Sequence, residues 1–140
     1  MAATREQLEE LVLAYLSMIG DRELGRAAER LSADVVMVFP GDEEHVSLHD
    51  QQAAAVDRYR DVRKSFGSVD VDLERQVVVV QGTLTGENVH GVAFQHVRFV
   101  DRFEIVDGLI CRQEVWNDLG VTGVLNAQRP ADMPQRYRQL

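Results

Sequence analysis

The spacing of the apolar residues changes from helical to strand-like near the middle of this chain. In much of the sequence before position 69, apolar side chains recur every three or four residues, which is typical of one face of an α-helix. From Val69 the pattern alternates, with Asp70 and Asp72 between Val69, Val71 and Leu73. Alternation of this kind predicts a strand with one buried face. Helices first and strands last predict an α+β fold, with the helices on one face of the sheet.

A pair of helices is expected at the N-terminus. Thr4 and Gln7 have the spacing of a capping box, in which each side chain accepts a hydrogen bond from the backbone of the other residue. The helix that follows carries apolar residues at helical spacing and ends near Gly20, because glycine is common at helix C-termini. Asp21 can cap a second helix directly after it.

Two short strands and a third helix are expected next. Residues 35–39 form an apolar, β-rich run, and residues 45–48 form a second short strand. Asp50 can cap a third helix, and Gly67 would end it. The apolar stripe of this helix would consist of Ala55, Tyr59, Val62 and Phe66.

The second half of the chain is expected to form an antiparallel meander of four strands. The first strand covers the alternating residues from Val69, and the others cover residues 77–85, 95–106 and 109–117. Asp107 followed by Gly108 is a strong hairpin signal between the last two strands. Consecutive strands joined by short turns therefore pair as neighbours in one sheet.

Length, charge and cysteine content limit the classes of function. A chain of 140 residues matches one domain, which we place at residues 1–126, followed by a C-terminal tail over residues 127–140. The net charge of -8 argues against nucleic acid and anionic membranes as partners, because phosphate binding needs clustered positive charge. No apolar run, including residues 35–39, is long enough to cross a membrane. A single cysteine, Cys111, favours a reducing compartment, so a cytoplasmic location is expected.

One carboxylate lies in the middle of an apolar strand face. Asp101 shares its face of the expected strand with Val97, Phe99, Phe103 and Ile105. Burial of an ionised carboxylate without a partner is costly, so this group is expected to be either neutral or paired with a donor. A neutral carboxylic acid can give a proton to a substrate oxygen. The alternative is a structural role, in an internal salt bridge or a hydrogen bond to a helix N-terminus.

Several features together resemble the nuclear-transport-factor-2-like (NTF2-like) superfamily. They are an N-terminal helix that carries Tyr15, a break at residues 20–21, the strand end and hairpin at residues 106–110, and a last strand that ends at residues 116–118. The resemblance is to the SnoaL-like branch, which is polyketide cyclase-like and ketosteroid isomerase-like. It implies a cone in which a strongly bent antiparallel sheet wraps around three helices from the N-terminal half and encloses an apolar pocket. It also implies a homodimer formed through the outer face of the sheet.

The resemblance implies roles for two residues and leaves the general base open. Asp101 and Tyr15 resemble, by their surroundings, the protonated aspartate and tyrosine that bind the substrate oxygen in ketosteroid isomerase, so both are candidate catalytic residues. Phe39 and Val115 stand where relatives carry a catalytic carboxylate, so no base is identified. The candidate substrate-binding residues, for some of which plain core packing is the alternative, are Phe39, Tyr59, Phe99, Phe103, Gln113, Asn117 and His90.

The sequence carries no recognisable cofactor or metal motif. It lacks a glycine-rich nucleotide loop, a P-loop and a Gly-x-Ser-x-Gly elbow, so no cofactor is expected. His45 and His49 would share one face of a short strand, which leaves a metal-dependent enzyme as an alternative. Because zinc normally takes three or four ligands and no such set is spaced here, we expect no metal site.

The sequence therefore predicts a cofactor-independent enzyme of the SnoaL-like type. It would use acid/base chemistry on a small, apolar, oxygen-bearing substrate, as an isomerase, cyclase, dehydratase or epoxide hydrolase. The alternative, favoured by Phe39 and Val115 in place of carboxylates, is a small-molecule-binding or dimerisation module without catalysis. In either case the expected partners are a small molecule and a second copy of the chain.

Overall fold

The computed structural model describes residues 2–139, which form one six-stranded sheet with helices on its inner side. The strand order is β2-β1-β6-β5-β4-β3. The β1–β6 pair is parallel and every other neighbouring pair is antiparallel. The strands are β1 (Leu31–Phe39), β2 (Glu43–His45), β3 (Tyr59–Asp72), β4 (Val77–Asn88), β5 (Ala93–Val106) and β6 (Leu109–Asn117). The helices are α1 (Arg5–Gly20), α2 (Leu24–Ala28), α3 (Leu48–Ala55), α4 (Leu119–Thr122), η1 (Pro130–Asp132) and η2 (Gln135–Tyr137).

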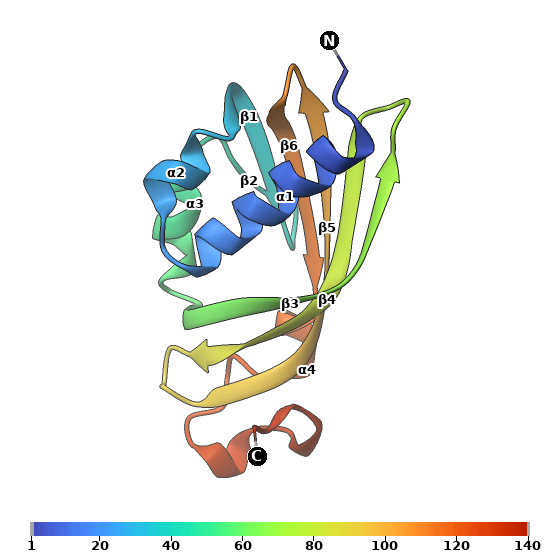
Figure 1. Cartoon of the computed structure of the whole chain (residues 1–140). Coiled ribbons are helices and arrows are strands. Elements are labelled where there is room, and N and C mark those ends of the chain that lie inside the picture. Colours follow the sequence, from blue (N-terminus) through green and yellow to red (C-terminus); the bar gives the residue numbers. More distant parts are fainter. Residues whose placement is uncertain (1, 140) are drawn as a thin grey trace.

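Helix α1 packs its apolar side onto the inner face of the sheet. The capping box expected at Thr4 and Gln7 is confirmed, and it satisfies backbone N–H groups in the first turn. The buried residues of α1 follow helical spacing and include Leu8, Val12 and Tyr15. Figure 1 shows α1 lying across the upper part of the sheet, with α2 and α3 beside it. The prediction of three helices before the meander is therefore confirmed.

The predicted third helix is wrong in its second half. Helix α3 ends at Ala55, and residues 59–67 form the beginning of β3. The N-cap of α3 is Ser47, not Asp50 as expected. The Ser47 hydroxyl accepts a hydrogen bond from the backbone N–H of Asp50 at 3.1 Å. This segment forms a strand because it pairs along its whole length with β4, whose residues are distant in the sequence. Helical propensity is a weak preference that such pairing routinely overrides.

The long strands bend midway, and the bends shape the interior. Figure 1 shows β3, β4 and β5 turning from an upright to a crosswise direction. The β3–β4 register shifts between Phe66 and Ser68, next to Gly67, and glycine also occupies position 82 opposite. A β-bulge of this kind bends a strand and increases its local twist. The crosswise half of β3 thereby forms a wall below the helices.

The hairpin and the last strand agree closely with the sequence. Asp107 and Gly108 both have positive φ, 52° and 78°, as a type I′ turn requires. Strand β6 has the predicted bounds, and the four-strand meander is confirmed.

Residues of the C-terminal segment pack on the crosswise end of the sheet. The buried side chain of Asn88 donates hydrogen bonds to the carbonyl oxygens of Val124 and Ala127, at 2.9 and 2.7 Å. Met133 is buried, and the Gln95 side chain donates to the carbonyl of Arg138 at 2.7 Å. These contacts hold the C-terminal segment against β4 and β5.

Candidate active site

The inner face of the bent sheet borders a cavity of about 430 Å³. All six strands, α3 and α4 contribute to its lining, and the volume lies in the range of small-molecule sites. A smaller cavity of about 80 Å³ adjoins it and reaches Tyr15 and Gln113. Both cavities are lined by Phe39, Gln51, Tyr59, Val62 and Lys64. The interior therefore offers a largely aromatic and aliphatic space with few charged groups.

An ion pair joins β3 to β5 at this cavity. The Nζ atom of Lys64 donates a hydrogen bond to Oδ2 of Asp101 at 2.5 Å. The Asp101 side chain is 0% exposed, and its cross-strand neighbours, Val80 and Val115, are buried and apolar. Lys64 is 22% exposed and lines both cavities. The ammonium group thus stands between the buried carboxylate and the cavity.

An aromatic ring lies against the lysine as well. The ammonium lies 4.9 Å from the centroid of the Phe99 ring, within the range of a cation–π interaction. Together with the carboxylate, this ring leaves the ammonium as a donor of hydrogen bonds toward the cavity. The second carboxylate oxygen of Asp101, Oδ1, is buried and has no hydrogen-bond partner among residues 2–139.

Tyr15 and Gln113 form a second polar pair next to the first. The Tyr15 hydroxyl donates to Oε1 of Gln113 at 3.2 Å, and both residues are buried. Burial, and then the negative charge of Asp101, raise the pKa of Tyr15 well above its usual range. The phenol therefore stays neutral and remains a donor. Because Oε1 of Gln113 is occupied, its amide NH₂ is the group available to the smaller cavity.

Aromatic side chains form much of the cavity wall. Phe39, Tyr59 and Phe99 line the larger cavity. Burial also raises the pKa of Tyr59, so its hydroxyl is a neutral donor in this space. Phe103 lies behind the wall, where its ring meets that of Tyr15 edge-on at 6.0 Å. Asn117 lines the cavity, and its Oδ1 accepts from the backbone N–H of Leu119 at 3.1 Å.

A third polar cluster lies on β2 and after α3. The Nε2 atom of His45 is 2.9 Å from Oε1 of Glu43, and Arg58 donates to the other oxygen of Glu43. All three residues line the larger cavity. The His45 side chain is 13% exposed, and its ring meets that of Phe39 edge-on at 5.8 Å. Histidine, carboxylate and guanidinium therefore form one connected chain at the cavity wall.

Most of the residues singled out in the sequence lie in or beside the two cavities. Tyr15, Phe39, Tyr59, Phe99, Gln113 and Asn117 line one cavity or both. Asp101 reaches the larger one only through Lys64, and Phe103 packs behind it. His90 is exposed in the β4–β5 turn and lines neither cavity, because Asn88 accepts a hydrogen bond from the backbone of His90 and holds this turn.

The expectation that His45 and His49 share a strand face is wrong. Ser47 ends the extended segment and caps α3, so His49 lies in the first turn of that helix and is exposed. Across residues 2–139, no three histidine, cysteine or acidic side chains are grouped closely enough to hold a metal ion. His45 instead has Glu43 as its partner.

Lys64 does not stand out in the sequence, because the helical spacing of Ala55, Tyr59, Val62 and Phe66 predicts a helix over residues 59–67. The signal that could have found it is period-two spacing, since Val62 and Lys64 alternate with the exposed Arg63 and Ser65. A strand interpretation would have placed one lysine on an inward face. A single inward lysine and a single inward aspartate in one sheet would then have suggested a pair.

Comparison with solved structures identifies the fold. TerC, co-crystallised with polyporic acid, matches at TM-score 0.77 and 19% identity, over 86% of this chain and 99% of TerC. A proposed SnoaL-like polyketide cyclase from Jannaschia sp. CCS1 matches at TM-score 0.70 and 20% identity, over 91% and 98% of the two chains. An NTF2-like protein from Burkholderia pseudomallei matches at TM-score 0.73 and 17% identity, over 86% and 98%. No family model matches the sequence, and no curated protein is significantly similar to it.

These similarities confirm the NTF2-like cone that the sequence resemblance implied. Solved structures with this fold include proteins of the polyketide cyclase, ketosteroid isomerase and epoxide hydrolase types. At identities of about one residue in five or fewer, they establish the architecture, and the activity has to be argued from the residues of this site.

Proposed function

We propose that this protein is a cofactor-independent enzyme that uses acid/base chemistry on a small, apolar, oxygen-bearing substrate in the larger cavity. The observation that carries the proposal is the Lys64–Asp101 pair, a buried ion pair whose ammonium lines an otherwise largely apolar cavity. A buried ion pair contributes little net stability, because desolvation of both charges offsets their attraction. A preorganised ammonium in a largely apolar cavity is, however, well suited to stabilise negative charge that develops on a substrate oxygen.

Asp101 and Lys64 would act as one acid. Lys64 would hydrogen-bond the substrate oxygen, and Asp101 would hold the ammonium in place and balance its charge. Tyr15 would act through Gln113, since its hydroxyl fixes the side-chain amide of that residue. The amide NH₂ of Gln113 would then donate a hydrogen bond to a part of the substrate that extends into the adjoining smaller cavity.

The known structures with this fold support a small-molecule ligand. TerC was co-crystallised with polyporic acid, and several other matches are of enzyme types. The aromatic walls formed by Phe39, Tyr59 and Phe99 suit a flat, apolar ligand. Isomerase, cyclase, dehydratase and epoxide hydrolase chemistry all need an acid that stabilises a substrate oxygen, so the site supports this group of reactions together.

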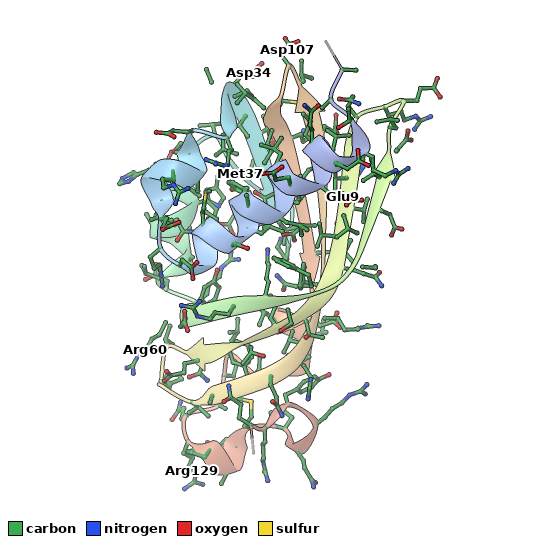
Figure 2. The ribbon with its side chains drawn as sticks, in the orientation of Figure 1. Glu9, Asp34, Met37, Arg60, Asp107 and Arg129 are labelled. Atoms are coloured by element: carbon green, nitrogen blue, oxygen red, sulfur yellow. The ribbon has the colours of Figure 1, made fainter. Side chains whose placement is uncertain are left out.

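Proton exchange next to a carbonyl tests the proposal without knowledge of the natural substrate. We expect the wild-type protein to accelerate deuterium uptake by β-tetralone in D₂O, measured by ¹H NMR. Asp101→Asn removes the charge that holds the ammonium, and it is expected to lower the rate about 100-fold or more. Asp107→Asn is the matched control, because it makes the same chemical change at the tip of the β5–β6 hairpin (Figure 2), and Asp107 lines neither cavity.

Two results would contradict the proposal. One is exchange by the wild-type protein no faster than by buffer, while β-naphthol still binds in the cavity; this result favours the non-catalytic binding module. The other is an Asp101→Asn variant that is folded and as active as the Asp107→Asn control.

We also propose that two copies of the chain associate through the outer face of the sheet, as the sequence resemblance implies. This face carries an open groove beside Trp116, which is 53% exposed. Val100 is the cross-strand neighbour of Trp116 and lines the same groove. A large exposed aromatic beside other apolar surface is typical of protein interfaces.

Sedimentation equilibrium tests the dimer. We expect a mass of twice 15.8 kDa for the wild-type protein. Trp116→Glu should shift the equilibrium to monomer, because it places a charge in the buried interface. Val46→Glu alters another exposed apolar residue, before α3, and should leave the dimer intact. A wild-type mass of 15.8 kDa at micromolar concentration would overturn the proposal.

The composition supports a cytoplasmic setting for this activity. Cys111 is a free thiol, and free thiols persist in a reducing compartment. Among residues 2–139, no helix is long and apolar enough to span a membrane.

A further inference from the structure

We infer that His45 is the general base of this site, and that Glu43 and Arg58 position it. The inference rests on the proposed acid/base function and supplies the group that the Lys64–Asp101 pair lacks. An acid that stabilises a substrate oxygen does not by itself remove a proton from carbon, and a second group must do so. Phe39 and Val115, where relatives carry carboxylates, both line the cavity and cannot accept a proton.

The backbone places His45 next to Phe39 on the inward side. Strand β2 pairs with β1 so that His45 lies opposite Met37, and Glu43 lies opposite Phe39. Directly paired residues point to the same face of a sheet, and Met37 is fully buried in the core. His45 and Glu43 therefore face the interior from the sheet edge, and both line the larger cavity together with Lys64.

The hydrogen bonds leave one ring nitrogen of His45 available. With Nε2–H donating to Glu43, Nδ1 carries the lone pair, and Nδ1 has no hydrogen-bond partner in the part of the chain that the structure describes. A ring nitrogen held by a carboxylate on one side and open on the other is the arrangement of a histidine base. Glu43 fixes the tautomer, and Arg58 in turn holds Glu43.

The charges that face His45 are consistent with a proton acceptor. Its own strand contributes Glu43, and the segment after α3 contributes Arg58. Strand β1 presents the apolar side chains of Met37 and Phe39, and α3 contributes Gln51, an uncharged amide, to the same cavity. The Glu43 carboxylate would stabilise the imidazolium that forms when His45 accepts a proton.

The proton transfer balances with these residues alone. Nδ1 of His45 takes a proton from the carbon next to a substrate carbonyl, and the electron pair of that C–H bond forms a C=C bond. The carbonyl π pair moves onto oxygen, which accepts a hydrogen bond from Lys64. In D₂O the imidazolium exchanges this proton for a deuteron from solvent and delivers the deuteron to the same carbon; the C=C pair forms the new C–D bond and the C=O bond re-forms, which gives deuterium uptake. Delivery of a proton to another carbon of a conjugated system gives isomerisation.

The β-tetralone assay separates this inference from the proposed function. His45→Gln is expected to lower the rate of deuterium uptake about 100-fold or more, the contribution typical of a general base. His49→Gln, at an exposed position in α3, is the matched control and should retain the wild-type rate.

Glu43 is tested as a positioning residue by its coupling to His45. Glu43→Gln should lower the wild-type rate about 10-fold and have no further effect in the His45→Gln background, because it acts through that ring. A merely structural role would give the same added loss in both backgrounds. The unfolding midpoint and the affinity for β-naphthol verify that each variant is folded with an intact cavity.

The β-tetralone results distinguish failure of the His45 inference from failure of the proposed function. If the wild-type protein accelerates uptake and His45→Gln does so equally, the inference is overturned and the proposed function stands. If the wild-type protein binds β-naphthol but does not accelerate uptake, the proposed function fails and the role of His45 as a base fails with it.

Discussion

Replacement of Lys64 by methionine is expected to destabilise the protein by about 3–5 kcal/mol at pH 7. The physical reason is the carboxylate left behind: Asp101 is 0% exposed, and Lys64 is the partner of one of its oxygens while the other has none among residues 2–139. Methionine fills a similar volume without charge, so packing is largely preserved. Urea denaturation followed by circular dichroism measures the free energy of unfolding.

Two further variants test whether the cost of Lys64→Met comes from the unpaired Asp101 carboxylate or from loss of the lysine side chain itself. Asp101→Asn should cost less, about 1–3 kcal/mol, because Lys64 is 22% exposed and its ammonium can turn to water in the cavity. The double variant Lys64→Met, Asp101→Leu removes both charges and should recover most of the loss. If the free-energy cost of the double variant equals the sum of the costs of the single substitutions, the two side chains are not coupled.

The sequence predicts the parts of this fold where local preference and tertiary structure agree. The capping box at Thr4 and the hairpin at Asp107 depend on neighbouring residues, so both are visible in the sequence and both are confirmed. The segment from Tyr59 to Gly67 is different, because its structure is set by pairing with β4. The inward Lys64 also interrupts the alternation typical of a strand, since an inward position is usually apolar and this one carries a charge.

The candidate site could be predicted only in part, for a related reason. The unusual position of Asp101 is visible because its neighbours on the same strand face are apolar. Its partner Lys64 lies 37 positions away, in the part of β3 where the sequence pattern predicts a helix. For His45, the short spacing to Glu43 was visible, but Arg58 joins them only through the turn that follows α3. Pairings of this kind depend on register, which hydrophobic spacing does not specify for a strand with a charged inward face.

The bend that carries Lys64 into the interior depends on close contact between β3 and β4. A Cβ atom at Gly82 would lie 1.9 Å from the carbonyl oxygen of Ser65 and 3.0 Å from the backbone nitrogen of Gly67. Neither atom can move without opening the sheet. We therefore expect Gly82→Ala to cost about 3 kcal/mol or more, at the upper end for added core atoms. Urea denaturation measures the loss, and weaker binding of β-naphthol would report the displaced cavity wall.

Gly25→Ala provides the matched control for this prediction. Both substitutions add one methyl group and restrict the unfolded chain equally, so the difference between them reports the folded state alone. Gly25 lies within α2, where a Cβ atom would meet no other atom within 4 Å. Alanine there should stabilise the protein by about 0.5–1 kcal/mol, because it favours the helix. If Gly82→Ala unfolds at the same urea concentration as Gly25→Ala, the two strands do not approach as closely as described, and Lys64 would lose the support that holds it against Asp101.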